Sequence, residues 1–172
     1  MISRQTARGM EITAEDFHLE QTLDCGQCFR WNADESGVYR GIAFGYPARV
    51  WTENGEVYLC SDAPEKMWRE YFDLDRDYAG ISAGFHGGEY LDSCIAYGQG
   101  IRILRQEPWE ALCSFIISQN NNIPRIKGII DRLCAGFGDD IGGGFYSFPD
   151  ASAVAAAGVD GLAVLRSGFR AK

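Results

Sequence analysis

The order of apolar and polar positions over the first sixty residues is typical of β-strands. Segments 39–43 and 48–52 alternate or cluster in β-favouring residues, with the turn-prone stretch 44–47 between them. An Asn-Gly pair at 54–55, which favours a tight hairpin, precedes a further strand at 57–60. The pattern predicts an antiparallel meander with one buried face.

After residue 61, apolar residues recur at helical spacing. Asp62 is predicted to cap a first helix, with Pro64 inside its first turn. The clearest amphipathic face follows at 126–133, where apolar residues recur every three or four positions. Strands followed by helices predict the α+β class rather than alternating α/β. Other predicted helices cover 90–97, 108–118, 151–157 and 162–165, and glycines at 142–144 indicate a flexible loop.

Composition narrows the class of protein. The 172-residue chain is 46% hydrophobic, which supports a folded core, and its net charge of −8 is unusual for a DNA-binding protein. Residues 1–100 carry 17 acidic and 8 basic groups, whereas residues 101–172 carry 7 and 8. The second stretch is therefore the expected contact surface for any nucleic acid.

The sequence also bears on location. No apolar run reaches the roughly 18 residues of a membrane span, and the first ten residues do not resemble a secretory signal. We therefore expect a protein that is not secreted. It would be cytoplasmic and nucleoid-associated in a bacterium, or nuclear in a eukaryote.

The chain contains six cysteines. Without a secretory signal a disulfide framework is not expected, and buried thiols are predicted instead, with Cys94, Cys113 and Cys134 inside apolar helical patterns. Cys25 and Cys28 form the one CxxC pair. The two histidines show no zinc-ligand spacing, so we predict no metal site and no cofactor.

Three successive amides, at Asn120, Asn121 and Asn122, join two predicted apolar helices. A structural interpretation is that Asn121 or Asn122 caps the second helix, with Pro124 in its first turn. A functional interpretation is that this loop and Arg125 enter a DNA duplex. An amide and a guanidinium fork both suit the Watson–Crick edge of a base that has lost its partner. The residues alone leave both interpretations open.

Two further stretches carry candidate chemistry. Gly26 either supplies a turn before a strand containing Phe29 and Trp31, or lets a flat ligand approach the backbone because it has no Cβ. Phe169 and Arg170 belong either to a basic tail or to a wedge that enters a base stack.

Together, motifs along the chain resemble those of the 8-oxoguanine DNA glycosylases, in order and spacing from about residue 16 onward. The resemblance implies an N-terminal antiparallel-sheet domain of that type over residues 1–98. A partial helical domain over residues 99–172 would follow, truncated at its C-terminal end and without the family's helix-hairpin-helix. The matching segments are Cys25–Trp31, Phe72–Asp75, Gly100–Pro108, Ser114–Ile126 and Gly168–Ala171.

These enzymes excise oxidised guanine after flipping its nucleotide out of the duplex. The resemblance implies that Asn120 fills the vacated space beside the estranged cytosine. Asn121, Arg125 and Arg170 would be further contacts to the cytosine or the DNA, and Phe169 would be the wedge that buckles the stack.

Gly26 would recognise the lesion itself. At N7, 8-oxoguanine carries a hydrogen that guanine lacks, so a backbone carbonyl at Gly26 would bond the lesion and oppose normal guanine. An unpaired buried acceptor costs about 1–3 kcal/mol, so this contact gives part of the discrimination.

Catalysis in this family requires a lysine from the helix-hairpin-helix, which forms a Schiff base with the sugar, and a supporting aspartate. Lys66, Lys127 and Lys172 lie outside such a motif, so both catalytic groups are expected beyond residue 172 and none is assigned here. The resemblance implies a monomeric parent enzyme with DNA glycosylase and AP lyase activities. Its partner would be double-stranded DNA containing 8-oxoguanine paired with cytosine, without a membrane, and this chain alone is expected to be inactive.

Two other functions compete with this interpretation. One is a non-catalytic module that binds damaged DNA without cutting it. The other is a thiol-redox protein that uses Cys25 and Cys28, although the βαβ context of thioredoxin-like sites is missing.

Overall fold

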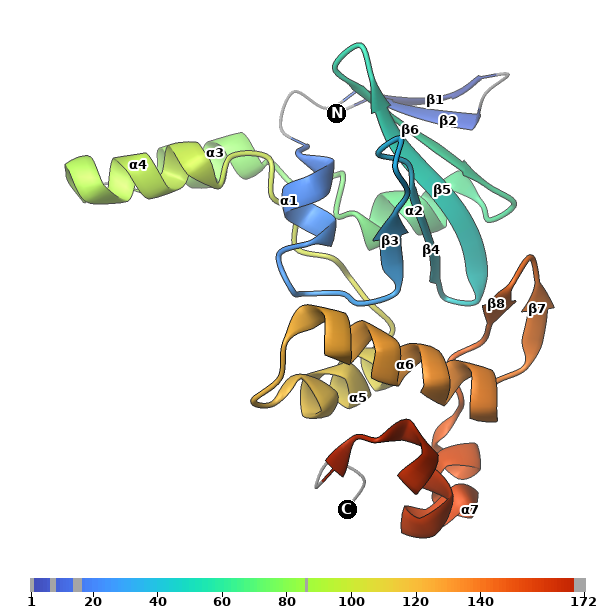
Figure 1. Ribbon diagram of the computed structural model, residues 1–172. Coiled ribbons are helices and arrows are strands. Elements are labelled where there is room, and N and C mark those ends of the chain that lie inside the picture. The colour runs from blue at the N-terminus through green and yellow to red at the C-terminus, as the bar shows by residue number, and fades with distance from the viewer. Residues whose placement is uncertain (1, 7–8, 14–16, 86, 169–172) are drawn as a thin grey trace.

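The computed structural model describes residues 2–6, 9–13, 17–85 and 87–168, and these form an α+β fold, as predicted (Figure 1). Its larger sheet has six strands in the order β1-β2-β6-β5-β4-β3, and every neighbouring pair is antiparallel. The strands are β1 (Ile2–Thr6), β2 (Gly9–Thr13), β3 (Trp31–Ala33), β4 (Tyr39–Ala43), β5 (Tyr46–Glu53) and β6 (Glu56–Ser61).

The predicted meander is confirmed for β4, β5 and β6. Asn54 and Gly55 connect β5 to β6, and both have positive φ angles, 54° and 84°. A two-residue hairpin turn of this kind requires such angles, which is why an Asn-Gly pair marks it in the sequence.

The first three helices along the described chain are short, and the last helices lie below the sheet (Figure 1). Within the described ranges, none combines the length and the apolar character needed to cross a membrane. The elements outside the large sheet are α1 (Leu19–Leu23), α2 (Glu65–Tyr71), α3 (Tyr78–Ala83), α4 (Glu89–Tyr97), α5 (Pro108–Ser118), α6 (Ile123–Phe137), the hairpin β7 (Asp140–Gly142) and β8 (Phe145–Tyr146), α7 (Ala151–Gly161) and the 3-10 helix η1 (Leu162–Leu165).

Three local predictions are corrected. Pro64 rather than Asp62 is the N-cap of α2, and no side chain caps that helix. Proline keeps the residue before it out of the helical region, so the helix begins after Pro64. The glycines at 142–144 turn a short β7–β8 hairpin instead of forming an irregular loop, because their positive φ angles suit a tight reversal.

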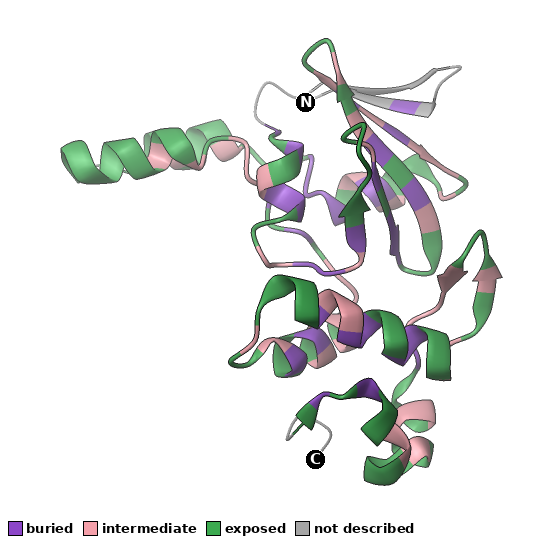
Figure 2. Ribbon diagram, in the orientation of Figure 1, coloured by how far each residue is buried: buried purple, intermediate pink, exposed green. Residues whose placement is uncertain are grey.

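The third correction concerns the cysteines. Cys28 and Cys134 are buried, but Cys25 and Cys94 are exposed. Cys94 lies on α4, which extends away from the body and has no buried residue (Figures 1 and 2). Its apolar stripe, including the 84% exposed Tyr90, therefore predicts the helix correctly but not its burial.

Two hydrophobic clusters lie in the fold. One packs the sheet against α1 and α2, with Trp31 and Trp68 at its centre, and the other surrounds the buried face of α6. Each cluster includes a residue from the other part of the chain, because Phe29 packs in the α6 cluster and Leu104 in the sheet cluster. The two parts are therefore interlocked, and the boundary at residues 98 and 99 stays a prediction.

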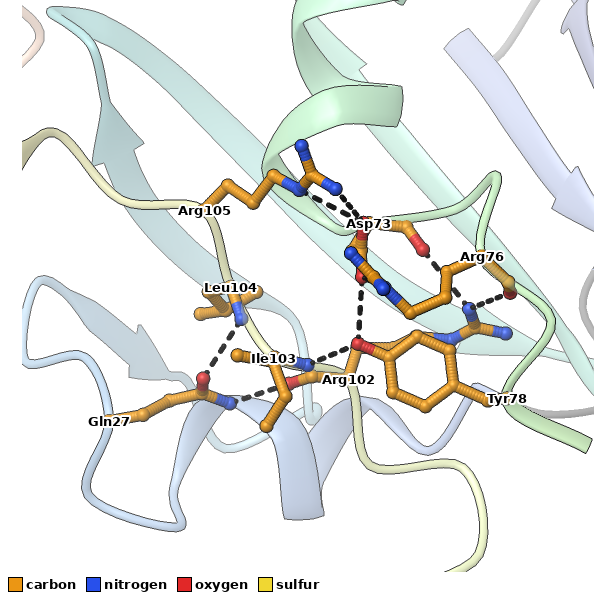
Figure 3. A network of polar contacts seen from close by, with 8 residues as sticks. All are labelled: Gln27, Asp73, Arg76, Tyr78, Arg102, Ile103, Leu104 and Arg105. Carbon is orange, nitrogen blue, oxygen red and sulfur yellow. Dashed lines mark hydrogen bonds and ion pairs between the residues drawn. The ribbon is translucent and has the colours of Figure 1, made fainter. Parts of the chain in front are cut away.

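A buried carboxylate anchors the chain where it passes from one part to the other (Figure 3). Asp73 is 6% exposed and has a φ of 49°. Its carboxylate accepts hydrogen bonds from Tyr78 Oη at 3.0 Å, from Arg105 Nε at 2.9 Å and from Arg76 Nε. Burial raises the pKa of Asp73, but hydrogen bonds from Arg76 and Tyr78 and the charge of Arg105 outweigh it, so the pKa lies below its ordinary value.

Arg102 fixes the linker, residues 101–107, against the same network. Its side chain is 2% exposed and donates to the carbonyls of Asp73 and Arg76, at 3.2 and 3.3 Å. The guanidinium also lies 4.4 Å from the centre of the Tyr78 ring, a cation–π contact (Figure 3). The linker therefore has a defined path although it contains no helix or strand.

We expect Asp73→Asn to lower the free energy of unfolding by about 1–3 kcal/mol at pH 7, because it removes charge-assisted hydrogen bonds. Asparagine tolerates a positive φ, so the substitution tests the charge rather than the backbone. A lowered folded pKa means that the stabilisation is present above the unfolded value of about 3.9 and disappears as pH falls through the folded value. Chemical denaturation should therefore show wild type and variant converging in acid.

The neighbouring exposed Asp75 offers a control, since Asp75→Asn should change stability by less than about 0.5 kcal/mol. A difference between wild type and Asp73→Asn that stays constant from neutral to acid pH would contradict this account.

Candidate nucleic-acid interface

The segment 24–31, which we call the Gly26 turn, connects α1 to β3. Gly26 has a φ of 89°, a conformation that side chains with a Cβ rarely adopt. A Cβ placed there would lie 3.7 Å from Ile123 Cδ1, which is ordinary van der Waals contact. The backbone angle rather than crowding therefore requires glycine. The same distance places the turn beside the first residue of α6.

Gln27 attaches the turn to the linker (Figure 3). Its Nε2 donates to the carbonyls of Thr22 at 2.9 Å and Arg102 at 2.8 Å, and its Oε1 accepts from the backbone N–H of Leu104 at 2.9 Å. Its own carbonyl accepts from Gln106 Nε2 at 2.6 Å. One glutamine thus uses its side-chain amide and its carbonyl to hold the middle of the turn.

Arg30 attaches the end of the turn to the helical part. Its side chain is 8% exposed, lies 3.3 Å from Glu110 Oε2 on α5 and donates to the carbonyl of Tyr146 on β8. Burial raises the pKa of Glu110, and the charge of Arg30 opposes that rise. Phe29, next to Arg30, packs in the α6 cluster.

Lys127, on α6, contacts both ends of the turn. Its Nζ lies 3.2 Å from Asp24 Oδ1 and donates to the carbonyl of Trp31 at 2.6 Å. The second oxygen of Asp24 accepts from Tyr39 Oη at 2.7 Å. The lysine side chain is 16% exposed and that of Asp24 is 41% exposed, so the bond to the Trp31 carbonyl is partly buried whereas the ion pair with Asp24 is exposed.

The three amides between α5 and α6 differ in what they do. Asn122 is the N-cap of α6, because its Oδ1 accepts from the N–H of Arg125 at 3.0 Å, so the capping prediction is confirmed at Asn122. Asn121 donates to the carbonyl of Ile117 at 3.1 Å and accepts from the N–H of Asn122. Asn120 is exposed and has a φ of 50°. Asn120 is therefore accessible to a ligand at the loop between α5 and α6.

Arg125 connects this loop to the end of the described chain. Its Nη2 donates to the carbonyl of Arg166 at 3.3 Å. Arg132, two turns further along α6, donates through two nitrogens to the carbonyl of Leu165. Positive φ angles at Arg166 and Gly168 turn the chain here. Phe169 and Arg170 lie outside the described residues, so their roles stay predictions.

The structure thus brings two of the stretches singled out in the sequence close together, and it places the residues just before the third beside Arg125. Gly26 lies beside Ile123, and Arg125 contacts the segment that leads to Phe169. The sequence interpretation missed the structural roles of Gln27, Arg30 and Lys127. The sequence gave no indication that Lys127 pairs with Asp24, because a lone lysine on a helix usually faces solvent.

Metal and thiol chemistry find little support in this region. Among the described residues, no group of three His, Cys, Asp or Glu side chains is arranged to hold a metal ion. Burial raises the pKa of the Cys28 thiol far above its ordinary value, which disfavours the reactive thiolate. The burial of Cys28 therefore disfavours the thiol-redox interpretation.

Comparison with known proteins identifies the family. The sequence profile of the 8-oxoguanine DNA glycosylase N-terminal domain matches residues 10–112. The N-glycosylase/DNA lyase of Saccharomyces cerevisiae is 47% identical over 188 residues, which cover 95% of this chain and 49% of the yeast protein. The chain therefore belongs to the 8-oxoguanine DNA glycosylase family, and it spans about half the length of the curated relatives that it matches.

Solved structures agree with this assignment. The apo-form of Clostridium acetobutylicum 8-oxoguanine glycosylase/lyase has a TM-score of 0.90 and 36% identity, over 99% of this chain and 62% of that chain. The structure of that glycosylase/lyase with double-stranded DNA containing cytosine opposite 8-oxoG has a TM-score of 0.89 and 36% identity, over 99% and 61% of the two chains. The family resemblance of the motifs is thus confirmed, while the roles of single residues stay predictions.

A pair of glycine substitutions tests the turn. Gly26→Ala should lower the free energy of unfolding by about 1–2 kcal/mol, because alanine disfavours a positive φ. Gly136→Ala, on an exposed position of α6 with open space at its Cβ, should raise it by about 0.5–1 kcal/mol. Thermal or chemical denaturation measures both, and equal effects at the two positions would refute the strained-turn explanation.

Proposed function

We propose that this chain is the DNA- and lesion-recognising part of a bifunctional 8-oxoguanine DNA glycosylase/AP lyase that acts in DNA repair. The family assignment supports the class of activity. The observation that carries the recognition role is the proximity of the Gly26 turn to the start of α6, together with the contact from Arg125 to the carbonyl of Arg166. These contacts join the Gly26 turn, the start of α6 and the residues that precede Phe169, which are three segments distant in the sequence.

In the proposed complex, the lesion is flipped and its cytosine partner stays in the duplex. Asn120, exposed at the tip of the α5–α6 loop, fills the space that the lesion vacates. Arg125 and Arg170 donate to the cytosine acceptors, Phe169 wedges the stack, and Asn121 supports the loop as it meets DNA. Filling the hole offsets the few kcal/mol that unstacking and unpairing cost.

Lesion specificity would come in part from the carbonyl of Gly26. The N7–H of 8-oxoguanine donates to that carbonyl, whereas guanine presents an acceptor to it. The anchoring of Gln27 and Arg30 supports this role, because a carbonyl discriminates between donors only when the backbone cannot turn away.

Asparagine-to-glycine substitutions at matched positions test the recognition role. Asn120 and Asn54 are both exposed and have φ angles of 50° and 54°, so glycine is compatible with the backbone at either site. Asn120→Gly should weaken binding to an 8-oxoguanine·cytosine duplex about tenfold, equivalent to about 1.4 kcal/mol, because it removes the side chain that fills the hole. Asn54→Gly, in the β5–β6 turn, should leave binding unchanged.

Fluorescence anisotropy with labelled duplexes measures these affinities. Equal affinities for wild type and Asn120→Gly would show that Asn120 is not part of the interface. Equal losses for both variants would show a general effect of the added glycine.

We also propose that this chain alone does not form the Schiff base. Of its lysines, Lys66 is exposed on α2 near Glu70, and Lys127 is engaged with Asp24 and the Trp31 carbonyl. Borohydride treatment of the chain with an 8-oxoguanine·cytosine duplex should therefore trap no covalent adduct, and an adduct would contradict the proposal. The same treatment of the product of the whole reading frame separates a glycosylase/lyase, which is trapped, from a non-catalytic damaged-DNA-binding module, which is not.

A further inference from the structure

Lys127 is distinguished by the two elements that it joins. It belongs to α6, which buries Ile126, Ile129 and Ile130 in the α6 cluster. From this rigid helix its Nζ reaches the carboxylate of Asp24, which caps the end of α1, and the carbonyl of Trp31, which begins β3. One ammonium group therefore contacts the first and last residues of the Gly26 turn.

Phe29 packs against α6 through apolar contacts, but the other polar anchors of the turn lead elsewhere. Gln27 bonds to the linker, and Arg30 bonds to α5 and β8. Lys127 instead connects the turn to the helix whose first turn contains Arg125 and whose cap is Asn122. The apolar packing of Phe29 in the α6 cluster is compatible with sliding, whereas two directed hydrogen bonds fix a distance.

The contacts are of a strong kind. The bond from the ammonium to the Trp31 carbonyl is 2.6 Å long, and hydrogen bonds from a charged donor are about twice as strong as neutral ones. The lysine side chain is 16% exposed and this bond is partly buried, so water competes less for it than for the exposed contact with Asp24. Tyr39 donates to the other carboxylate oxygen of Asp24 and so holds the acceptor in place.

We propose that Lys127 is a positioning residue that keeps the Gly26 turn in register with Asn120 and Arg125. This inference rests on the proposed function, in which the turn meets the lesion while the α5–α6 loop meets the estranged cytosine. The two bases are recognised by different elements, so lesion discrimination requires a fixed distance between those elements. A displacement of about 1 Å is enough to lose a contact that depends on geometry.

The proposal separates specificity from general DNA affinity. Lys127→Met removes both polar contacts and keeps an unbranched side chain that is one atom shorter. We expect the preference of the variant for an 8-oxoguanine·cytosine duplex over a guanine·cytosine duplex to fall about fivefold or more. The reason is that the Gly26 carbonyl no longer accepts a hydrogen bond from the N7–H of the lesion. Binding to a duplex with an abasic-site analogue opposite cytosine, which has no base to offer Gly26, should change less than twofold, on the order of the error of such measurements.

Three variants serve as references. Lys66→Met removes the same charge from an exposed site on α2, where the lysine lies 3.8 Å from Glu70, and should leave the preference unchanged. Lys127→Arg retains charged donors and should restore most of the preference. Asp24→Asn removes the ion pair but leaves the Trp31 carbonyl contact, so its preference should lie between wild type and Lys127→Met.

Amide hydrogen exchange tests the positioning without DNA. Exchange in residues 24–31 should be faster in Lys127→Met than in wild type, while exchange in β4, β5 and β6 should be unchanged. Unchanged exchange in the turn, or a lesion preference that survives Lys127→Met, would overturn the proposal. If Lys127→Met is poorly folded, which faster exchange throughout the sheet would reveal, Asp24→Asn and Lys127→Arg decide the same question.

These measurements also distinguish the two proposals. A wild-type chain that binds DNA without preferring the lesion would refute the proposed recognition function, and the lesion-specific role of Lys127 with it. Faster exchange of the turn in Lys127→Met under that result would still show that the lysine fixes the turn. If the wild-type chain prefers the lesion and Lys127→Met has the same preference, the proposed function stands but Lys127 has no part in it.

Discussion

The structure depends on the fixation of an eight-residue turn by groups from the rest of the chain. Residues 24–31 have no regular hydrogen-bonding pattern of their own over most of their length, and Gly26 has a backbone angle that other residues avoid. The turn is ordered because Gln27 bonds to the linker, Arg30 to α5 and β8, and Lys127 to both ends. Irregular backbone near a buried core must find such partners, because unpaired polar groups are costly there.

The same contacts explain why the two parts of the fold are not independent units. Phe29 packs in the α6 cluster and Leu104 in the sheet cluster, so each core includes a residue from the other part. Asp73 and Arg102 hold the linker between them. A surface built from both parts can therefore keep a constant shape, which a flexible connection would not allow.

Much of the fold could be predicted from local patterns. The Asn-Gly turn at 54–55, the amphipathic face of α6 and the cap at Asn122 are all determined by short-range chemistry, and the structure has them where the sequence indicated. The start of α2 at Pro64 and the exposure of Cys94 could not be predicted in the same way. The former depends on the stereochemistry of Pro64, and the latter on whether another element covers α4.

The candidate site was predictable in a different sense. Its residues were recognised through family motifs, and their proximity to one another is a tertiary property that spacing in sequence does not encode. The pairing of Lys127 with Asp24 joins positions that are 103 residues apart, and neither residue belongs to a sequence pattern that predicts the other. The roles of the anchoring residues could therefore be recognised only from the structure.

We propose that the Gly26 turn and the α5–α6 loop form one surface that recognises a lesion and its partner together. An NMR titration of the labelled chain with 8-oxoguanine·cytosine and guanine·cytosine duplexes tests it most directly. We expect the amide signals of Gly26, Asn120 and Arg125 to shift together in the titration with the lesion duplex. The signal of Gly26 should shift only with the lesion duplex. Signal changes confined to α3 and α4, or a Gly26 response that is the same for both duplexes, would contradict it.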